Sequence, residues 1–178
     1  MKIVNTKLDG CVIIEPKVFG DDRGFFLETF NVSRYASLLG ISESFVQDNH
    51  SHSYMGVLRG LHLQRKNPQG KLVRVLRGEV FDVAVDCRPS SPTFGQWESV
   101  FLSGKNKKQF WIPPGFAHGF QVLCDSTDFE YKCTTYYDPS DEVAIRWDDP
   151  FLDIPWPIKP PTLSDKDSKA LFLSDVRL

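Results

Sequence analysis

The chain has 178 residues, a net charge of −2, 41% apolar and 25% charged residues, which is ordinary for one globular domain and argues against intrinsic disorder. It has no Lys/Arg block, so we expect no nucleic-acid partner. No run approaches 18 apolar residues and the N-terminus has no apolar signal core, so we expect no membrane insertion, no export and a cytoplasmic location. The four cysteines are scattered without a CxxC spacing, which fits the same reducing compartment.

The first part of the chain alternates apolar segments with turn residues. Strands are predicted over residues 11–16 and 24–30, with a turn at 20–24 between them. A helix is predicted from Asn31, the expected N-cap, to Gly40, just past its end. Its apolar positions repeat with helical spacing at Val32, Tyr35, Ala36 and Leu39.

Strand patterns dominate the rest of the chain. Residues 72–77 and 79–86 predict a hairpin that turns at Gly78, and further strands are predicted at 96–102, 109–113, 117–124 and 128–137. Short strands at about ten-residue spacing predict an all-β sandwich or barrel. We expect a single domain over 1–178, with a core at about 10–147 and a proline-rich wrap at 148–178 that ends in a short helix capped by Ser164.

Polar and basic side chains concentrate in the segment 48–64 and at Lys71, just before the longest strand pattern. The segment contains His50, His52, Arg59 and His62. Such groups are tolerated near a core only where they are paired or partly hydrated, so the segment is predicted to line a cavity. A flat strand would turn Arg59 and His62 to opposite faces, but Gly60 between them would permit a bulge that brings them together.

A pocket with His, Lys and Tyr suits removal of a proton beside a ketone. An imidazole is a base with a pKa near neutrality, and a lysine can stabilise the enolate oxygen that develops. These roles fit His62 and Lys71. The acid on the opposite face is left open between Tyr131 and Tyr137, and the carboxylate behind the histidine between Asp167 and Asp82.

Two glycine and histidine segments, 56–62 and 113–118, resemble the signatures of the cupin superfamily, in which three histidines and a glutamate hold a metal. Here Gln64 stands where the second histidine would be, and Pro68 and Gln69 stand where the glutamate would be. Two imidazoles alone make a poor site for a divalent ion. The pattern therefore predicts the barrel without the metal.

The whole chain resembles the dTDP-4-dehydrorhamnose 3,5-epimerase family. The motifs that carry this resemblance occur in the family's order at residues 22–28 (DRGFFLE), 47–49 (QDN), 56–62 (GVLRGLH), 69–73 (QGKLV), 78–86 (GEVFDVAVD), 91–95 (SPTFG), 113–120 (PPGFAHGF), 131–134 (YKCT) and 163–167 (LSDKD).

The resemblance implies a metal-free, cupin-type jelly roll (double-stranded β-helix) that needs no cofactor, forms a homodimer and acts on a dTDP-sugar. It implies His62 as base, Tyr131 as acid, Asp167 as the partner of His62, and Lys71 beside the keto oxygen. The implied contacts with the nucleotide sugar are Arg23, Glu28, Gln47, Asn49, Arg59, His118, Glu142 and Lys166, with Tyr137 stacked on the thymine.

The implied substrate is dTDP-4-dehydro-6-deoxy-D-glucose, and the implied pathway leads to dTDP-L-rhamnose. Three other readings stay open. One is an epimerase that inverts only C3 or only C5 of a related sugar. Another is a metal-dependent cupin such as a dioxygenase, against which Gln64 argues. The last is a non-catalytic binder of nucleotide sugars.

Overall fold

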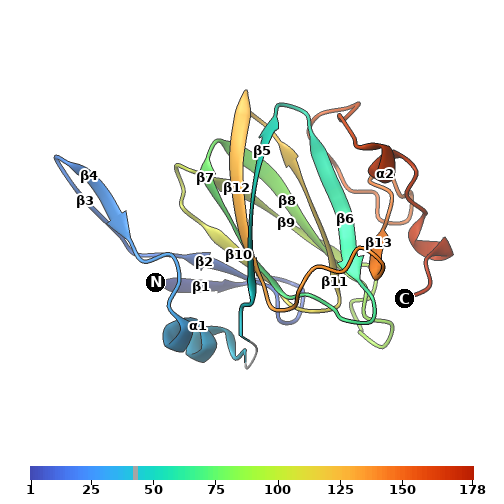
Figure 1. Ribbon diagram of the computed structural model, residues 1–178, viewed down its shortest axis with the longest axis horizontal. Coiled ribbons are helices and arrows are strands. Elements are labelled where there is room, and N and C mark those ends of the chain that lie inside the picture. Colours follow the sequence, from blue (N-terminus) through green and yellow to red (C-terminus); the bar gives the residue numbers. More distant parts are fainter. Residues whose placement is uncertain (42–43) are drawn as a thin grey trace.

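The computed structural model describes residues 1–41 and 44–178, and it consists of two β-sheets packed face to face (Figure 1). The larger sheet has the strand order β1 (Lys2–Asn5), β2 (Val12–Glu15), β10 (Gln109–Ile112), β7 (Lys71–Arg77), β12 (Ser126–Cys133) and β5 (Gln47–Tyr54). The smaller sheet has the order β13 (Glu142–Ala144), β6 (Leu58–Gln64), β11 (Phe116–Val122), β8 (Glu79–Asp86) and β9 (Trp97–Ser103). The predicted all-β jelly roll is confirmed.

Alternation along the strands divides each sheet into an inner and an outer face. In β12, Phe129 and Cys133 are buried, whereas the intervening Glu130 is half-exposed and pairs with Arg74 at 2.8 Å on the outer face. The apolar core between the sheets includes Val73, Val75, Val80, Ala84, Phe110, Phe116, Phe120, Val122 and Phe129. The polar pocket of the molecule borders this apolar core.

The predicted hairpin at Gly78 is wrong. β7 pairs with β10 and β12 in the larger sheet, whereas β8 pairs with β11 and β9 in the smaller one. Gly78 is instead a corner between the two sheets, with a φ of +90°. A Cβ at this position would lie 2.4 Å from Thr127 Oγ1, so only glycine fits. A turn residue between two apolar runs predicts a reversal of the chain but does not reveal which sheet receives the second run.

A two-stranded hairpin, β3 (Val18–Asp21) and β4 (Gly24–Leu27), projects away from both sheets (Figure 1). The sequence did not predict β3, and the predicted strand 24–30 ends early, at Leu27. The hairpin exposes much of its apolar surface, since the exposed fractions of Phe19, Phe25 and Phe26 are 52%, 59% and 70%.

Helix α1 (Val32–Leu39) confirms the predicted caps: Asn31 Oδ1 accepts a hydrogen bond from the Arg34 amide, and Gly40 is left-handed. Its predicted apolar face is only partly right. Tyr35 is fully buried and donates a hydrogen bond to Gln109, but Val32 is 63% exposed. The helix is short and touches the larger sheet through a narrow stripe, so the flanking apolar positions remain outside the contact.

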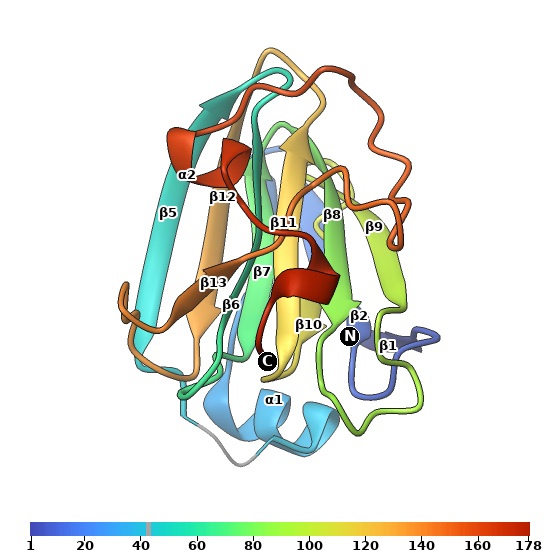
Figure 2. The same ribbon diagram turned by 90° about the vertical axis from the view of Figure 1, so that its right-hand side faces the viewer.

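The C-terminal segment wraps over the outer face of the smaller sheet (Figure 2), and Leu152, Ile154 and Trp156 pack there against side chains such as Leu61 and Phe81. It ends in α2 (Asp165–Ser168), where Ser164 Oγ accepts from the Asp167 amide as predicted, and in the 3-10 helix η1 (Leu173–Asp175). Within the described residues, no helix is long and apolar enough to cross a membrane.

Candidate active site

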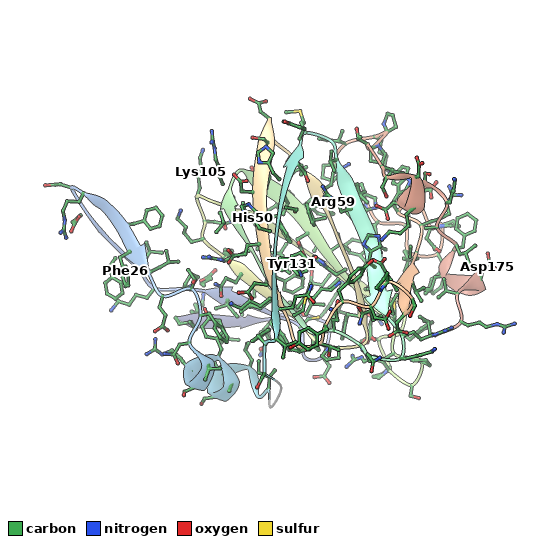
Figure 3. All side chains as sticks on the ribbon, viewed as in Figure 1. Phe26, His50, Arg59, Lys105, Tyr131 and Asp175 are labelled. Carbon is green, nitrogen blue, oxygen red and sulfur yellow. The ribbon has the colours of Figure 1, made fainter. Side chains whose placement is uncertain are left out.

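A pocket of about 690 Å³ opens between the two sheets and under α2. Of the catalytic and substrate-binding residues that the family resemblance implies, all line it except Arg23 and Glu28. The lining residues from this set are Gln47, Asn49, Arg59, His62, Lys71, His118, Tyr131, Tyr137, Glu142, Lys166 and Asp167. Figure 3 labels Arg59 on β6, Tyr131 on β12 and Phe26 on the hairpin that projects from the sheets.

A bulge in β6 brings Arg59 and His62 to the same pocket, as the position of Gly60 predicts. Arg59 pairs with Phe120 and His62 with His118, so β6 uses one residue more than β11 between the two pairs. Gly60 has a φ of +126°, and a Cβ there would lie 2.5 Å from Gly119 Cα. The bulge therefore requires glycine, and it corrects the opposite orientations that a regular strand would impose.

The imidazole of His62 is held by a carboxylate from the C-terminal segment. His62 Nε2 lies 2.5 Å from Asp167 Oδ1, and Asp167 is only 3% exposed. Burial acts to raise the pKa of Asp167, but the hydrogen bond and charge of His62 together with Ser164 and Lys166 outweigh it, and the pKa lies below its usual value. Asp167 is therefore ionised and accepts the proton of His62 Nε2, so in the neutral imidazole Nδ1 is the nitrogen without a proton.

Glu142 lies on the Nδ1 side of the same imidazole and forms hydrogen bonds with two other side chains at the mouth of the pocket. Its Oε1 is 3.6 Å from His62 Nδ1, and its Oε2 accepts from Lys166 Nζ at 2.6 Å and from the Tyr137 hydroxyl at 2.9 Å. Tyr137 is fixed further because its amide donates to Gln47 Oε1 at 2.8 Å. Glu142, Lys166 and Tyr137, all predicted to touch the ligand, are thus joined by hydrogen bonds beside Nδ1 of His62.

Lys71 and Tyr131 extend into the pocket from neighbouring strands of the larger sheet. Lys71 is 8% exposed, and burial lowers its pKa below the usual value. Its Nζ donates to the backbone oxygen of His62 at 3.4 Å. Burial raises the pKa of Tyr131 to about 12, so the phenol keeps its proton at neutral pH. The pocket therefore combines a neutral proton donor, an unprotonated imidazole nitrogen and an amine whose charge is only weakly solvated.

The other histidine of the pocket has its own carboxylate. His118 Nε2 lies 3.0 Å from Asp82 Oδ2, and Asp82 is fully buried, which raises its pKa against the opposing effect of His118. Of the two carboxylates that the sequence left open for His62, the structure brings Asp167 to it and pairs Asp82 with His118. The two histidines thus belong to two separate carboxylate pairs in one pocket.

The structure does not bring every polar residue of the 48–64 segment into the pocket. His50 and His52 lie on the outer face of β5 and both contact Asp128 Oδ1, at 3.2 and 2.9 Å, so their predicted place in the cavity is wrong. The strand alternation sends them outward while Asn49 and Ser51 face inward.

Arg23 and Glu28 lie at the hairpin, outside the pocket of their own chain. Arg23 pairs with Asp21 and Glu28 with Arg34, and the exposed fractions of the Arg23 and Glu28 side chains are 90% and 36%. Their predicted contact with the nucleotide sugar has no support within a single chain.

Gln64 stands where a metal-binding cupin has its second histidine, and in this structure its side chain holds the backbone of neighbouring loops. Gln64 Nε2 donates to the backbone oxygens of Asn67 and Tyr136, and its Oε1 accepts from the Asp138 amide at 2.8 Å. Both polar atoms of the Gln64 side chain are thus engaged in hydrogen bonds that link two loops. Within the described ranges, no group of three or more His, Cys, Asp or Glu side chains is arranged to hold a metal ion. The absence of a metal from the reaction stays a prediction.

Several lining residues were not predicted from the sequence. They are Ser51, Val57, Leu58, Gln69, Phe120, Thr162, Leu163 and Ser164. For Ser51 a signal existed, because Asn49, Ser51 and Ser53 alternate along β5 with the outward His50 and His52. For Thr162 and Leu163 there was none, since their place follows from the path of the wrapped tail.

Comparison with known proteins identifies the family of this chain. The family model for dTDP-4-dehydrorhamnose 3,5-epimerase matches residues 5–175. The enzyme of that name from Salmonella typhimurium is 54% identical over 100% of this chain and 98% of its own length.

Solved structures show the same relationship. A dTDP-6-deoxy-D-glucose-3,5-epimerase from Legionella pneumophila, in complex with dTDP-4-keto-L-rhamnose, is 59% identical, covers 99% of this chain and 94% of its own, and superposes with a TM-score of 0.97. A 3'-monoepimerase from Streptomyces bikiniensis is less similar, at 33% identity, with a TM-score of 0.89 and coverage of 95% and 86%. On the match over nearly its whole length, the chain belongs to the dTDP-4-dehydrorhamnose 3,5-epimerase family of isomerases.

Proposed function

We propose that this chain inverts C3 and C5 of dTDP-4-dehydro-6-deoxy-D-glucose and so produces the keto sugar from which dTDP-L-rhamnose is made. The observation that carries the proposal is the pairing of His62 with Asp167 in a pocket that also holds Lys71 and Tyr131. Binding alone requires neither a base nor an acid. The names of relatives that are 54% and 59% identical support the same reaction.

In the proposed mechanism, His62 Nδ1 removes the proton from the carbon beside the C4 ketone. Asp167 stabilises the imidazolium that results, and the ammonium of Lys71 stabilises the enolate oxygen. Tyr131 then delivers a proton to the opposite face of the ring. A positioned base or acid contributes roughly 10²- to 10⁴-fold in rate. Because one ketone activates both neighbouring carbons, the same groups serve both inversions.

The remaining predicted residues form the proposed nucleotide subsite. The guanidinium of Arg59 suits the diphosphate, because its paired N–H groups match phosphate oxygens. The ring of Tyr137, at the mouth, is proposed to stack on the thymine, with Gln47, Asn49, His118, Glu142 and Lys166 as polar contacts. We expect neither nucleic acid nor a membrane as partner, in line with the net charge of −2. We also propose a cytoplasmic location and a single domain.

We also propose a homodimer in which the β3–β4 hairpin reaches the pocket of the second copy. The hairpin exposes Phe19, Phe25 and Phe26, and a two-stranded hairpin on its own is at best marginally stable. A docked hairpin would bury these rings and carry Arg23 and Glu28 towards the partner's pocket. This arrangement accounts for two site residues that have no place in the pocket of one chain.

Mixing two inactive variants tests the exchange of hairpins. Arg23→Ala and His62→Ala dimers are each expected to be inactive, or nearly so. If the hairpin serves the partner, a mixed dimer has one site with both residues intact, and random subunit exchange restores roughly a quarter of the wild-type activity. If the hairpin serves its own chain, every site in the mixture stays defective and no activity returns. A monomer in light scattering would also contradict the proposal.

Deuterium incorporation tests the reaction itself. The protein is incubated with dTDP-4-dehydro-6-deoxyglucose in deuterated water, and the sugar is analysed by NMR. Deuterium at C3 and C5 with inverted configuration is expected, and His62→Ala should abolish the exchange. Deuterium at one carbon would identify a mono-epimerase, the activity named for the 33% identical relative from Streptomyces bikiniensis. No exchange despite tight binding would indicate a binding module.

A further inference from the structure

One ionisable side chain of the pocket has no hydrogen-bond partner. Within the described residues, every ionisable side chain that lines the pocket takes part in a hydrogen bond except Tyr131. Burial raises the pKa of Tyr131 to about 12, so its hydroxyl carries a proton at neutral pH. Tyr131 is thus a proton donor that no other side chain of the pocket holds.

The other proton-bearing side chains are paired with carboxylates. Lys166 and Tyr137 both donate to Glu142 Oε2, at 2.6 and 2.9 Å, and His118 Nε2 lies 3.0 Å from the buried Asp82. The pocket therefore offers one free acid for the one base, His62. A second proton, needed by an oxygen on a neighbouring carbon of the sugar, has no comparable donor.

A single acid matters because an enolate can react in two ways. Once the proton at C3 is removed, the electrons can take up a proton at C3 again, or they can expel the substituent at C2, which lies β to the ketone. A hydroxyl at C2 needs a proton to leave, since the pKa of water is about 15.7 and hydroxide is a poor leaving group. With Tyr131 as the one free acid, protonation at carbon prevails over loss of water.

We infer that the pocket also catalyses elimination from 4-keto sugar nucleotides whose C2 substituent leaves without a proton, such as fluoride. His62 Nδ1 takes the C3 proton and later passes it to water. The electron pair of the C3–H bond enters the enolate, beside Lys71, and then forms the C2–C3 double bond as fluoride departs with the electrons of the C–F bond. The 3-hydroxy-enone that results tautomerises to a 3,4-diketone.

The inference rests on the proposed function, because it uses the same base and the same enolate. It concerns only one of the two inversions. C2 lies beside C3, whereas the other neighbour of the ketone, C5, carries a methyl group that cannot leave. Release of fluoride therefore reports proton removal at C3 alone.

The probe is the 2-deoxy-2-fluoro analogue of dTDP-4-dehydro-6-deoxy-D-glucose, and free fluoride is followed by fluorine NMR against a sample without protein. The wild type should release fluoride, and His62→Ala should slow the release by roughly 10²- to 10⁴-fold. Tyr131→Phe should release fluoride at least as fast as the wild type, because the competing protonation is lost, although it no longer inverts the natural substrate. Asp165→Asn, an exposed change outside the pocket lining, is the control for both reactions.

The natural substrate in deuterated water, tested with the same preparations, separates the contrary results. If the wild type exchanges the proton at C3 but releases no fluoride from the analogue, the inference is wrong and the proposed function stands. If Tyr131→Phe loses fluoride release together with inversion, elimination needs the tyrosine and the inference is wrong. Conversion of the natural substrate to the 3,4-diketone would show that an acid reaches the C2 hydroxyl, again against the inference. If C3 is not exchanged at all, the inference and the proposed 3,5-inversion both fail.

Discussion

His62 and Asp167 are separated by 105 residues in the chain, yet their Nε2 and Oδ1 atoms lie 2.5 Å apart. The contact joins a bulged strand of the smaller sheet to a one-turn helix at the end of the wrapped tail. It determines which nitrogen of the imidazole is free, and most of the predicted chemistry depends on that choice.

Replacing Asp167 by Asn should disable the base without unfolding the protein. An amide can donate a hydrogen bond to Nε2, which would move the imidazole proton to Nδ1 and remove the lone pair that abstracts the substrate proton. We expect kcat to fall by about 10²- to 10⁴-fold, with a smaller change in KM. Steady-state kinetics measures both values. Asp165→Asn, an exposed change in the same helix, is the control and should leave kcat unaltered.

Tyr131→Phe should separate proton removal from proton delivery. The variant keeps the aromatic ring, whose centroid lies 6.1 Å from that of Phe129, and loses only the hydroxyl. His62 can still abstract a proton and return it to the same face, so we expect deuterium uptake at one carbon without the normal inverted product. NMR of the sugar after incubation in deuterated water distinguishes the two. Normal 3,5-inversion by this variant would assign the acid to another group.

The alkaline limit of activity should depend on Lys71. Burial lowers the pKa of this amine, so it loses its charge at a pH below the usual value near 10.4 for a lysine, and kcat/KM should fall as the pH rises through that range. Lys71→Arg retains a cation that does not titrate there, and its remaining activity should lack this alkaline fall. A pH profile of kcat/KM for both proteins provides the check. An identical alkaline limb in both would mean that another group titrates.

Gly60→Ala should damage the fold and the site together. A Cβ at Gly60 would meet Gly119 Cα at 2.5 Å in a backbone conformation with φ +126°. We expect a loss of more than about 2 kcal/mol in the free energy of unfolding. We also expect a large loss of activity, because the bulge directs the side chains of both Arg59 and His62 into the pocket. Gly40→Ala is the control, since its φ is also positive but no atom lies within 4 Å of the added Cβ. It should cost about 1 kcal/mol and leave kcat intact. Chemical denaturation measures both.

Asp86 should contribute more to stability than any surface ion pair. It is fully buried and accepts hydrogen bonds from Arg88, Ser91 and Thr93. Burial acts to raise its pKa, but these bonds outweigh it and lower the pKa below the usual value. Asp86→Asn is expected to cost about 2–4 kcal/mol at neutral pH.

The pH dependence of that loss follows from the lowered pKa. The stabilisation by Asp86 is complete above the pKa of an unfolded aspartate, near 3.9, and disappears as the pH falls toward the lower pKa of the folded chain. The difference in unfolding free energy between wild type and Asp86→Asn should therefore shrink below about pH 4. Denaturant titrations at several pH values measure it. Asp148→Asn, which breaks an exposed pair with Arg146, should cost less than about 1 kcal/mol throughout.

The expected family and the all-β class could be predicted from the sequence because both depend on local patterns. Period-two alternation reports strands whatever their partners, and blocks such as residues 56–62 and 113–120 keep their spacing in any fold. The caps Asn31 and Ser164 were likewise correct, since capping involves atoms only three residues apart. The bulge at Gly60 followed from a conflict visible in the sequence, two pocket residues at positions that a regular strand would separate.

The errors arose where the answer lies in contacts between distant segments. The runs on either side of Gly78 are both strands, but only the packing of two sheets decides that they do not pair. His50 and His62 are similar in sequence context, and the register of β5 against β12 turns the first outward. The hairpin that carries Arg23 projects away from both sheets (Figure 1), and Arg23 does not line the pocket of its own chain.

The family, the strand-rich class and the groups available for acid–base chemistry are encoded in residue types and short-range spacing. Which of these groups act together follows instead from contacts between distant segments. The fold pairs Asp167 with His62 and Asp82 with His118. Such contacts depend on the path of the whole chain, and no local pattern encodes the distance between two segments that folding brings together.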